Sequence, residues 1–234
     1  MSEQADVLAI GAHPDDIELG CAGALLKLRS QGRRIAVVDL SRGELGTRGT
    51  AEVRAQEAAA SAEVLGLDFR TNLGLEDGNI QPTAENRLKL IRILRQTRPR
   101  LVITHSRWGH PDHSQAAQLV EDAVHHAGLA RIDTGQERFR PEKIASWMQF
   151  NQPRMPQLLV DISEFMDVKE EAILAFASQF HKFGSRELET YLSRPDILDQ
   201  IRSFHKHLGS LIGCHFAEGF LLSRPPRVED LSSC

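Results

Sequence analysis

The fold of this chain is decided by Val7-Leu8-Ala9-Ile10-Gly11-Ala12-His13-Pro14-Asp15-Asp16, close to its start. The first four residues form a short apolar run, which is typical of a buried strand in a parallel sheet. Gly11 and Ala12 are small enough for a sharp backbone turn, and Pro14 fixes one backbone dihedral angle. The stretch therefore predicts a strand that ends in a tight turn carrying one histidine and two aspartates.

Similar apolar runs recur through the first half of the chain, and helical patterns separate them. We expect strands at 7–10, 35–40, 69–73 and 101–104 and helices at 21–31, 51–65 and 84–96, with Gly32 and Gly66 as stop signals. This alternation predicts an α/β fold of the Rossmann-like type, with three layers (α/β/α) and a mostly parallel sheet. Ligands of such sheets bind beyond the carboxyl ends of the strands.

The second half has a looser pattern. A helix is expected at 112–126, strands at 144–150 and 158–160, and helices at 164–179 and 195–208. No linker rich in glycine, proline or serine divides the chain, so residues 1–234 are expected to form a single domain. Residues 224–234 are expected to be a surface tail.

Composition excludes several classes of protein. The 234 residues are 41% hydrophobic with a net charge of −4, and the two signs of charge are interspersed, so a nucleic-acid partner is not expected. Cys21, Cys214 and Cys234 show no close pairing, which fits a reducing compartment. The first residues lack a basic region, and no apolar run approaches the roughly 18 residues that span a bilayer. We therefore expect a soluble cytoplasmic protein with no membrane partner.

The first motif offers metal ligands and a base. His13 and Asp16 lie three residues apart across the turn, and imidazole and carboxylate groups both bind zinc. A catalytic zinc takes three protein ligands and leaves one position for water, so Asp15 would be free to take a proton from that water. An alternative is that Asp15 or Asp16 only caps the following helix by accepting its backbone N–H groups.

A second motif, Gly109-His110-Pro111-Asp112-His113, follows the strand expected at 101–104. His113 is the natural candidate for the third ligand. His110 could then stabilise an oxyanion or protonate a leaving amine, and Asp112 could orient an imidazole through its distal nitrogen. A His/Asp/His site also accepts other divalent ions. The remaining histidines considered are expected at the surface: His125, His126, His181, His205 and His207.

Together these residues resemble the PIG-L/LmbE-like superfamily of zinc-dependent N-acetylglucosamine deacetylases. The resemblance covers residues 13–20, 110–113, the run Ser41-Arg42-Gly43-Glu44-Leu45-Gly46-Thr47-Arg48-Gly49, Glu52 and Arg54, and residues 217–220. The length and the glycine-rich run look most like the bacillithiol branch, which acts on N-acetylglucosaminyl malate. The resemblance implies zinc on His13, Asp16 and His113, Asp15 as general base, and His110 as the group that stabilises the oxyanion.

The resemblance also suggests where the substrate binds. Arg54 would hold the malate carboxylate or sugar hydroxyls, and Arg48 and Arg140 are weaker candidates of the same kind. Tyr191 is expected in a loop near the site entrance, and Glu44 would steady the site from behind. Many members carry an arginine just before the second motif, where this chain has Trp108-Gly109, and an aromatic side chain there could stack on a sugar or reshape the pocket.

Other functions remain to be weighed against a malate-conjugate deacetylase. The same motifs would serve a deacetylase of an inositol or chitobiose conjugate or of an antibiotic precursor, or an amidase of thiol conjugates. A metal-binding regulator without activity is a further alternative. A nucleotide-binding domain fits poorly, because the first turn lacks Gly-x-Gly-x-x-Gly and would place two carboxylates where phosphate binds. The resemblance further implies a homo-oligomer.

Overall fold

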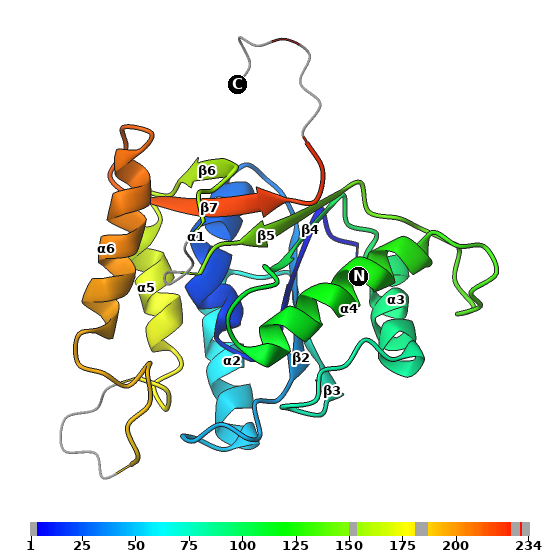
Figure 1. Ribbon diagram of the computed structural model, residues 1–234, viewed down its shortest axis with the longest axis horizontal. Helices are drawn as coiled ribbons and strands as arrows, with labels where there is room; N and C mark the ends of the chain where they lie inside the picture. The colour runs from blue at the N-terminus through cyan, green and yellow to red at the C-terminus, as the bar shows by residue number, and fades with distance from the viewer. Residues whose placement is uncertain (1–3, 150–153, 181–186, 226–229, 231–234) are drawn as a thin grey trace.

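Seven strands form one sheet in the order β3-β2-β1-β4-β5-β7-β6 (Figure 1). A computed structural model of the chain describes residues 4–149, 154–180, 187–225 and 230. The strands are β1 (Val7–Gly11), β2 (Ile35–Ser41), β3 (Phe69–Leu75), β4 (Leu101–His105), β5 (Lys143–Trp147), β6 (Leu158–Asp161) and β7 (Ala217–Leu222). All pairings among β1 to β5 are parallel, and β7 runs antiparallel to both neighbours. The expected α/β fold with a mostly parallel sheet is confirmed.

The strand order changes direction at β1. From β1 the chain moves outward through β2 to β3, and it then returns to place β4 on the other side of β1. In open α/β sheets this switch point creates a crevice beyond the carboxyl ends of the two central strands. Both motifs follow these strands, since His13 comes two residues after β1 and His110 five residues after β4. The topology thus brings together segments almost a hundred residues apart.

Helices cover both faces of the sheet (Figure 1). Side chains of α3 (Ala84–Thr97) and α4 (Pro111–Ala127) share one apolar core with the sheet, and α1 (Asp16–Ser30) packs on the opposite face. The helix α2 (Ala51–Leu65) contacts α1, and α5 (Met166–Leu174) packs on both α1 and α2. The last helix, α6 (Ile197–Ser210), lies against β7. Buried aliphatic residues on alternate sides of β1 and β2 join the two layers of helix to the sheet.

Local signals explain most helix ends. The side chains of Thr50 and Thr83 accept hydrogen bonds from backbone N–H groups in the first turns of α2 and α3, and Gly66 ends α2 with a positive φ of 60°. Two boundaries differ from expectation. The helix α1 begins at Asp16 rather than at residue 21, and α5 ends at Leu174 rather than at residue 179. Beyond α5 the chain continues in turns, and Ser178 there bonds to Glu57 of α2.

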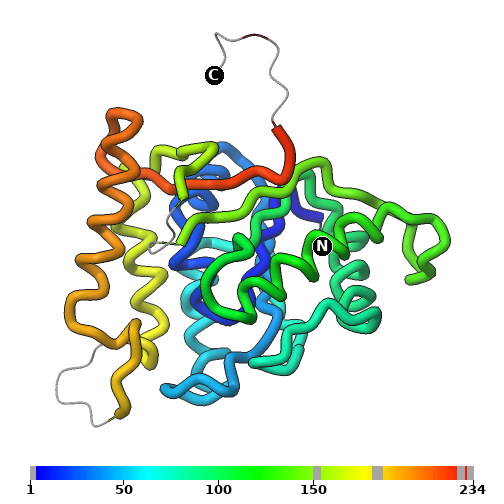
Figure 2. The backbone as a smooth tube through the Cα atoms, in the orientation of Figure 1, coloured from blue at the N-terminus to red at the C-terminus, as the bar shows by residue number. Residues whose placement is uncertain are grey.

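The strand β7 is the element that the sequence pattern missed. It lies between β5 and β6, and Figure 2 traces its return, coloured red, from the far end of the chain. Its first four residues are buried, but Glu218 interrupts the apolar run. The strand expected at 144–150 ends at Trp147 as β5, and Phe150 lies outside the described residues.

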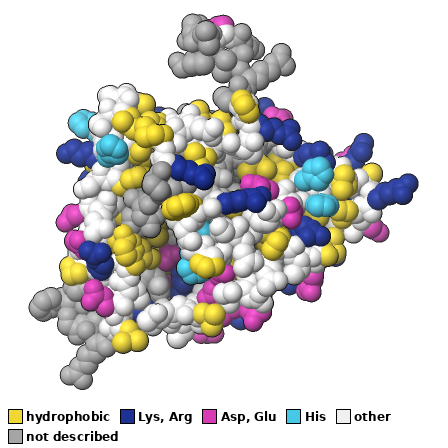
Figure 3. All heavy atoms as spheres, in the orientation of Figure 1, with side chains coloured by type: hydrophobic (Ala, Val, Ile, Leu, Met, Phe, Trp, Pro, Cys, Tyr) yellow, Lys and Arg dark blue, Asp and Glu magenta, His cyan; other side chains and the backbone are white. Residues whose placement is uncertain are grey.

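The surface carries charges of both signs, and Figure 3 shows them scattered over the visible face. Cys21 and Cys214 are free thiols, whereas Cys234 lies outside the described residues. Among the helices of the described ranges, none is long and apolar enough to cross a bilayer.

Candidate metal centre and active site

The turn after β1 presents the side chains of the first motif. Asp15 adopts a φ of 110°, a conformation that is strained for any residue with a side chain, and its carboxylate makes no capping hydrogen bond to α1. Helix capping therefore does not explain Asp15. Asp16 does accept a backbone hydrogen bond, from His13 N at 2.7 Å, but that group precedes the helix. The turn thus holds both carboxylates at the crevice.

Three side chains of the two motifs form a group with metal-binding geometry. One donor atom from each of His13, Asp16 and His113 lies within 4.8 Å of the others. Asp16 Oδ1 is 3.2 Å from His113 Nε2, and Asp16 Oδ2 is 3.5 Å from His13 Nδ1. Zinc bonds of about 2.0–2.1 Å at tetrahedral angles place two ligand atoms about 3.3 Å apart. The donor set and its spacing therefore fit a zinc ion.

The outer nitrogen of His13 faces two carboxylates. Its Nε2 lies 3.0 Å from Asp77 Oδ1 and 3.3 Å from Asp112 Oδ2. Burial opposes the charged ring, but the hydrogen bonds to Asp112, Asp16 and Asp77 raise the pKa of His13 to about 12. The hydrogen bond to His13 in turn lowers the pKa of Asp77 to about 2. Carboxylates in this position orient an imidazole whose other nitrogen binds metal.

Asp77 is a residue that the sequence patterns do not single out, because β3 is only weakly apolar. The signal available was its place just beyond the carboxyl end of a parallel strand. Asp77 Oδ2 accepts a hydrogen bond from Leu45 N at 2.8 Å, and Glu44 Oε1 accepts one from Asp77 N at 3.2 Å. Glu44 is exposed and is connected to the metal-binding group through its hydrogen bond to the backbone of Asp77.

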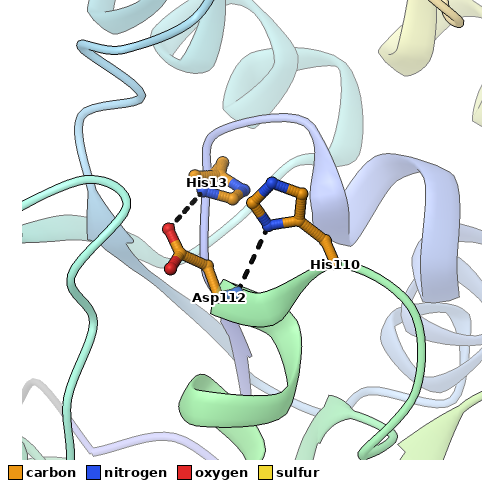
Figure 4. A group of neighbouring side chains, drawn as sticks. All are labelled: His13, His110 and Asp112. Atoms are coloured by element: carbon orange, nitrogen blue, oxygen red, sulfur yellow. Dashed lines mark hydrogen bonds and ion pairs between the residues drawn. The ribbon is translucent and has the colours of Figure 1, made fainter.

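His110 and Asp112 lie at the start of α4, facing His13 (Figure 4). His110 Nδ1 accepts a hydrogen bond from Asp112 N at 3.3 Å, so in the neutral ring the proton is on Nε2. Burial, together with the nearby His113 and His13, lowers the pKa of His110. A neutral imidazole with a free Nε2–H can donate a hydrogen bond to an oxyanion. His13, His110 and Asp112 form a second group that could bind a metal, but Asp112 Oδ2 already accepts a hydrogen bond from Gly78 N at 2.8 Å.

His105, at the end of β4, is a second residue that sequence reasoning missed. It is fully buried, its Nε2 lies 3.1 Å from Asp16 Oδ2, and its ring stacks on that of His113 at 4.1 Å. Burial lowers the pKa of His105 to about 4. Burial alone would raise the pKa of Asp16, but the charges of His113 and His105 lower it well below its usual value. On the other side of His113, the amide of Gln149 lies 2.6 Å from Nδ1. His105 thus contacts both Asp16 and His113, and Gln149 contacts His113.

Arg54 is buried and is paired with the candidate base. Its NH2 group lies 3.0 Å from Asp15 Oδ2 and also donates to the carbonyl oxygen of Pro14. Burial raises the pKa of Asp15 to about 7, and the charge of Arg54 opposes that shift. A carboxylate with a pKa near neutrality is suited to accept and return a proton. Arg54 is among the residues that line the cavity, and its guanidinium is directed at Asp15.

A cavity of about 550 Å³ opens above this group. Its far wall comes from the second half of the chain and combines apolar and aromatic side chains with two glutamines and a histidine: Trp147, Met148, Gln149, Gln179, Tyr191, Leu192, Phe204 and His205. Tyr191 is half exposed at the rim of the cavity, and its hydroxyl lies 3.3 Å from Gln200 Oε1. His205 was expected at the surface and is instead buried, with its Nδ1–H donating to Ala217 O at 2.9 Å. His125 and His207 are exposed, His126 is half-buried, and His181 lies outside the described residues.

Three residues expected near the substrate lie elsewhere. Arg48 is buried and pairs with Glu187 at 2.8 Å rather than lining the cavity. Arg140 donates to His125 O, about 18 Å along α4 from His113, so the structure does not bring it to the cavity. Trp108 is exposed and is absent from the described lining of the cavity, although Gly109 is part of it.

The family model named GlcNAc-PI de-N-acetylase, or PIG-L, matches residues 8–124, half of the chain. These residues include all three candidate ligands and Asp15. A diacetylchitobiose deacetylase from Thermococcus kodakarensis is 31% identical over 91% of this chain and 81% of its own length. The chain belongs to the PIG-L family.

Structural comparison agrees with this assignment. The PIG-L fold of this chain matches the crystal structure of a conserved protein from Thermus thermophilus with a TM-score of 0.87 and 38% identity, covering 97% of this chain and 99% of the other. A 4-oxalmesaconate hydratase from Pseudomonas putida is 27% identical over 76% of this chain and 75% of its own length. The family match and the similarity to a deacetylase show that this chain is an enzyme, a hydrolase that acts on N-acetyl amides.

Proposed function

We propose that this enzyme binds one Zn²⁺ ion through His13, Asp16 and His113 and hydrolyses the acetamide of an N-acetylglucosamine conjugate, releasing acetate. The observation that carries the proposal is the joint placement, at the base of one cavity, of a zinc-type donor set and a buried carboxylate with a pKa near 7. When bound, the ion supplies a Lewis acid for the amide carbonyl and lowers the pKa of a water molecule.

Asp15 and His110 act on the substrate, and the residues around them hold the reacting groups in place. Asp15 takes the proton of the attacking water and returns it to the leaving amine, while Arg54 holds its carboxylate in place. His110 donates its Nε2–H to the oxygen that becomes negative as the amide carbon turns tetrahedral. Asp112 and Asp77 hold the ring of His13.

Three candidates exist for the group attached to the amino sugar. The sequence resemblance favours malate, the family description names an inositol lipid, and the relative from Thermococcus is named for a chitobiose. A dicarboxylate such as malate needs a cationic partner. Arg54 is the one cationic side chain, lysine or arginine, among the described residues that line the cavity. Its guanidinium is already paired with Asp15.

The apolar and aromatic far wall instead suits the face of an uncharged sugar ring. We therefore place a neutral glycan or inositol conjugate ahead of N-acetylglucosaminyl malate.

Turnover of a substrate panel by the zinc-loaded enzyme tests this proposal. The panel contains diacetylchitobiose, N-acetylglucosaminyl inositol, N-acetylglucosaminyl malate and N-acetylglucosamine at equal concentrations, with free amine and acetate as readouts. The variant Asp15→Asn, at the same zinc content, is the control for hydrolysis that does not depend on this site.

The preference among these substrates decides the aglycone. A kcat/KM highest for the malate conjugate would reverse our order but keep the chemistry. If none of the four is hydrolysed and 4-oxalmesaconate is hydrated instead, the enzyme shares the reaction of its hydratase relative and the proposal fails.

A further inference from the structure

A buried ion pair lies beneath the middle of α1, outside the candidate metal centre. Lys169 of α5 and Glu218 of β7 are both fully buried, and Lys169 Nζ lies 2.8 Å from Glu218 Oε1. Removing two charges from water is costly, and apolar side chains of similar volume often stabilise a core as well as a buried ion pair does. Stability alone therefore does not account for this pair.

The ammonium group of Lys169 bonds to the backbone of α1. Nζ donates to the carbonyl oxygens of Glu18 at 3.0 Å and Leu19 at 2.9 Å, in addition to Glu218. An ammonium group has three N–H donors, and these three acceptors use all of them. Lys169 thus fixes the position of two consecutive peptide groups near the start of the helix.

The carboxylate of Glu218 bonds to the same helix about one turn further on. Oε1 accepts a hydrogen bond from Gly23 N at 2.9 Å, and Oε2 accepts one from Ala24 N at 2.7 Å. Hydrogen bonds to charged groups are stronger than neutral ones, and both are shielded from water here. The ion pair therefore holds one turn of α1 through two carbonyl and two N–H groups.

That turn is directly continuous with the metal-binding group. Glu18 follows Asp16 by two residues, and Leu19 and Gly20 line the cavity. Gly20 lies so close to Trp147 that an added Cβ would be 2.5 Å from its Nε1 atom. The ring of Trp147 lies 4.4 Å from that of His105, which contacts Asp16. A displacement of α1 would therefore move Asp16 both along the helix and through this packing.

We propose that the Lys169–Glu218 pair is a positioning element for the metal centre. It fixes the turn of α1 next to Asp16 and so keeps Asp16 Oδ1 directed at the position shared with His113 Nε2. The inference rests on the proposed function. Ligand groups must be held within about 0.5 Å of their working geometry, and apolar side chains could fill this space but could not bond to the helix backbone.

The double variant Lys169→Met with Glu218→Gln tests this role, because it removes both charges at nearly constant volume. For the metal-free protein, we would measure hydrogen exchange of the amides of residues 18–24 and the dissociation constant for Zn²⁺ by competition with a chromophoric chelator. We expect faster exchange and Zn²⁺ binding weakened by about tenfold, as for other residues that orient metal ligands. In turnover, kcat should fall more than KM changes.

Arg202→Gln is the matched control. Arg202 pairs with Asp167 at 2.9 Å and Glu170 at 2.7 Å, so it ties the same helix α5 to α6 instead of α1. This variant should lower the melting temperature of the metal-free protein while changing the Zn²⁺ dissociation constant by less than about twofold. The control separates general loosening of α5 from loss of the bonds to α1.

The outcomes are distinct. A double variant that melts earlier but keeps normal Zn²⁺ affinity and normal exchange in α1 would show a purely structural pair and overturn the inference. If the double variant does not fold, Glu218→Asp keeps the charge and withdraws the carboxylate by one methylene, and the same two measurements decide. If the wild-type protein hydrolyses no acetamide, the proposed function fails, whereas exchange and Zn²⁺ affinity still test the ion pair.

Discussion

Replacement of Arg54 by glutamine separates a role in base catalysis from a role in substrate binding. The guanidinium and the Asp15 carboxylate are buried 3.0 Å apart. At an effective dielectric of 20, unit charges at this distance attract by about 5 kcal/mol. Relaxation and entry of water would reduce the loss to about 3 kcal/mol, which corresponds to a rise of about two units in the pKa of Asp15. Because less of Asp15 is then ionised at pH 7, kcat should fall by up to about 100-fold with little change in KM.

The assay is amine release between pH 6 and 10 with equal zinc content in each protein. Turnover by Arg54→Gln should keep rising with pH for about two units beyond the pH at which turnover by the wild type levels off. Arg54→Lys keeps the charge and should recover most of kcat. If KM rises in Arg54→Gln while kcat stays normal, Arg54 binds the substrate, as the sequence suggested, and the pairing with Asp15 has no catalytic role.

Three further predictions follow from the structure. Asp15→Asn should keep zinc and lose about 10²–10⁴-fold in kcat, and His113→Ala should lose metal and activity together; full activity of zinc-loaded Asp15→Asn would exclude the base role. The pKa of His205 is lowered by burial to about 3, so the unfolded chain binds the extra proton between that value and about 6.5, and stability falls as the pH falls through this range. Chemical denaturation at pH 7 and 5 should show about 2 kcal/mol less acid loss for His205→Asn than for the wild type, and equal losses would contradict this. Gly20→Ala should cost about 1–3 kcal/mol, because its methyl group would overlap Trp147, and an unchanged melting temperature would refute that packing.

Patterns that are local in the sequence explain how much of the fold was predictable. The strands β1, β2 and β4 each begin with an apolar run, and the alternation of strand and helix leaves few topologies open. Parallel strands also end at a common edge, so the meeting of His13, Asp16 and His113 could be anticipated without coordinates. These three residues each follow a recognisable strand closely.

Features that depend on tertiary placement were not predictable in this way. Arg54 sits on a helix whose pattern reads as solvated, but it is buried between the turn at Pro14 and Asp15 and the loop at Gly43. Asp77 and His105 support the ligands from elements whose neighbours are set by the sheet order. The strand β7 carries a buried charge, Glu218, and its partner Lys169 lies 49 positions away on helix α5. Pairing of this kind leaves no periodic trace.

The far wall of the cavity has a consequence for how this family can diversify. The candidate ligands, the base and Arg54 all come from residues before 114, whereas the apolar wall comes from residues 147–205. Substitutions at wall positions such as Tyr191, Leu192 and Phe204 can therefore retarget the enzyme to a new conjugate. Other later residues are less free to change, because Gln149 contacts His113 and the Lys169–Glu218 pair bonds to α1 next to Asp16.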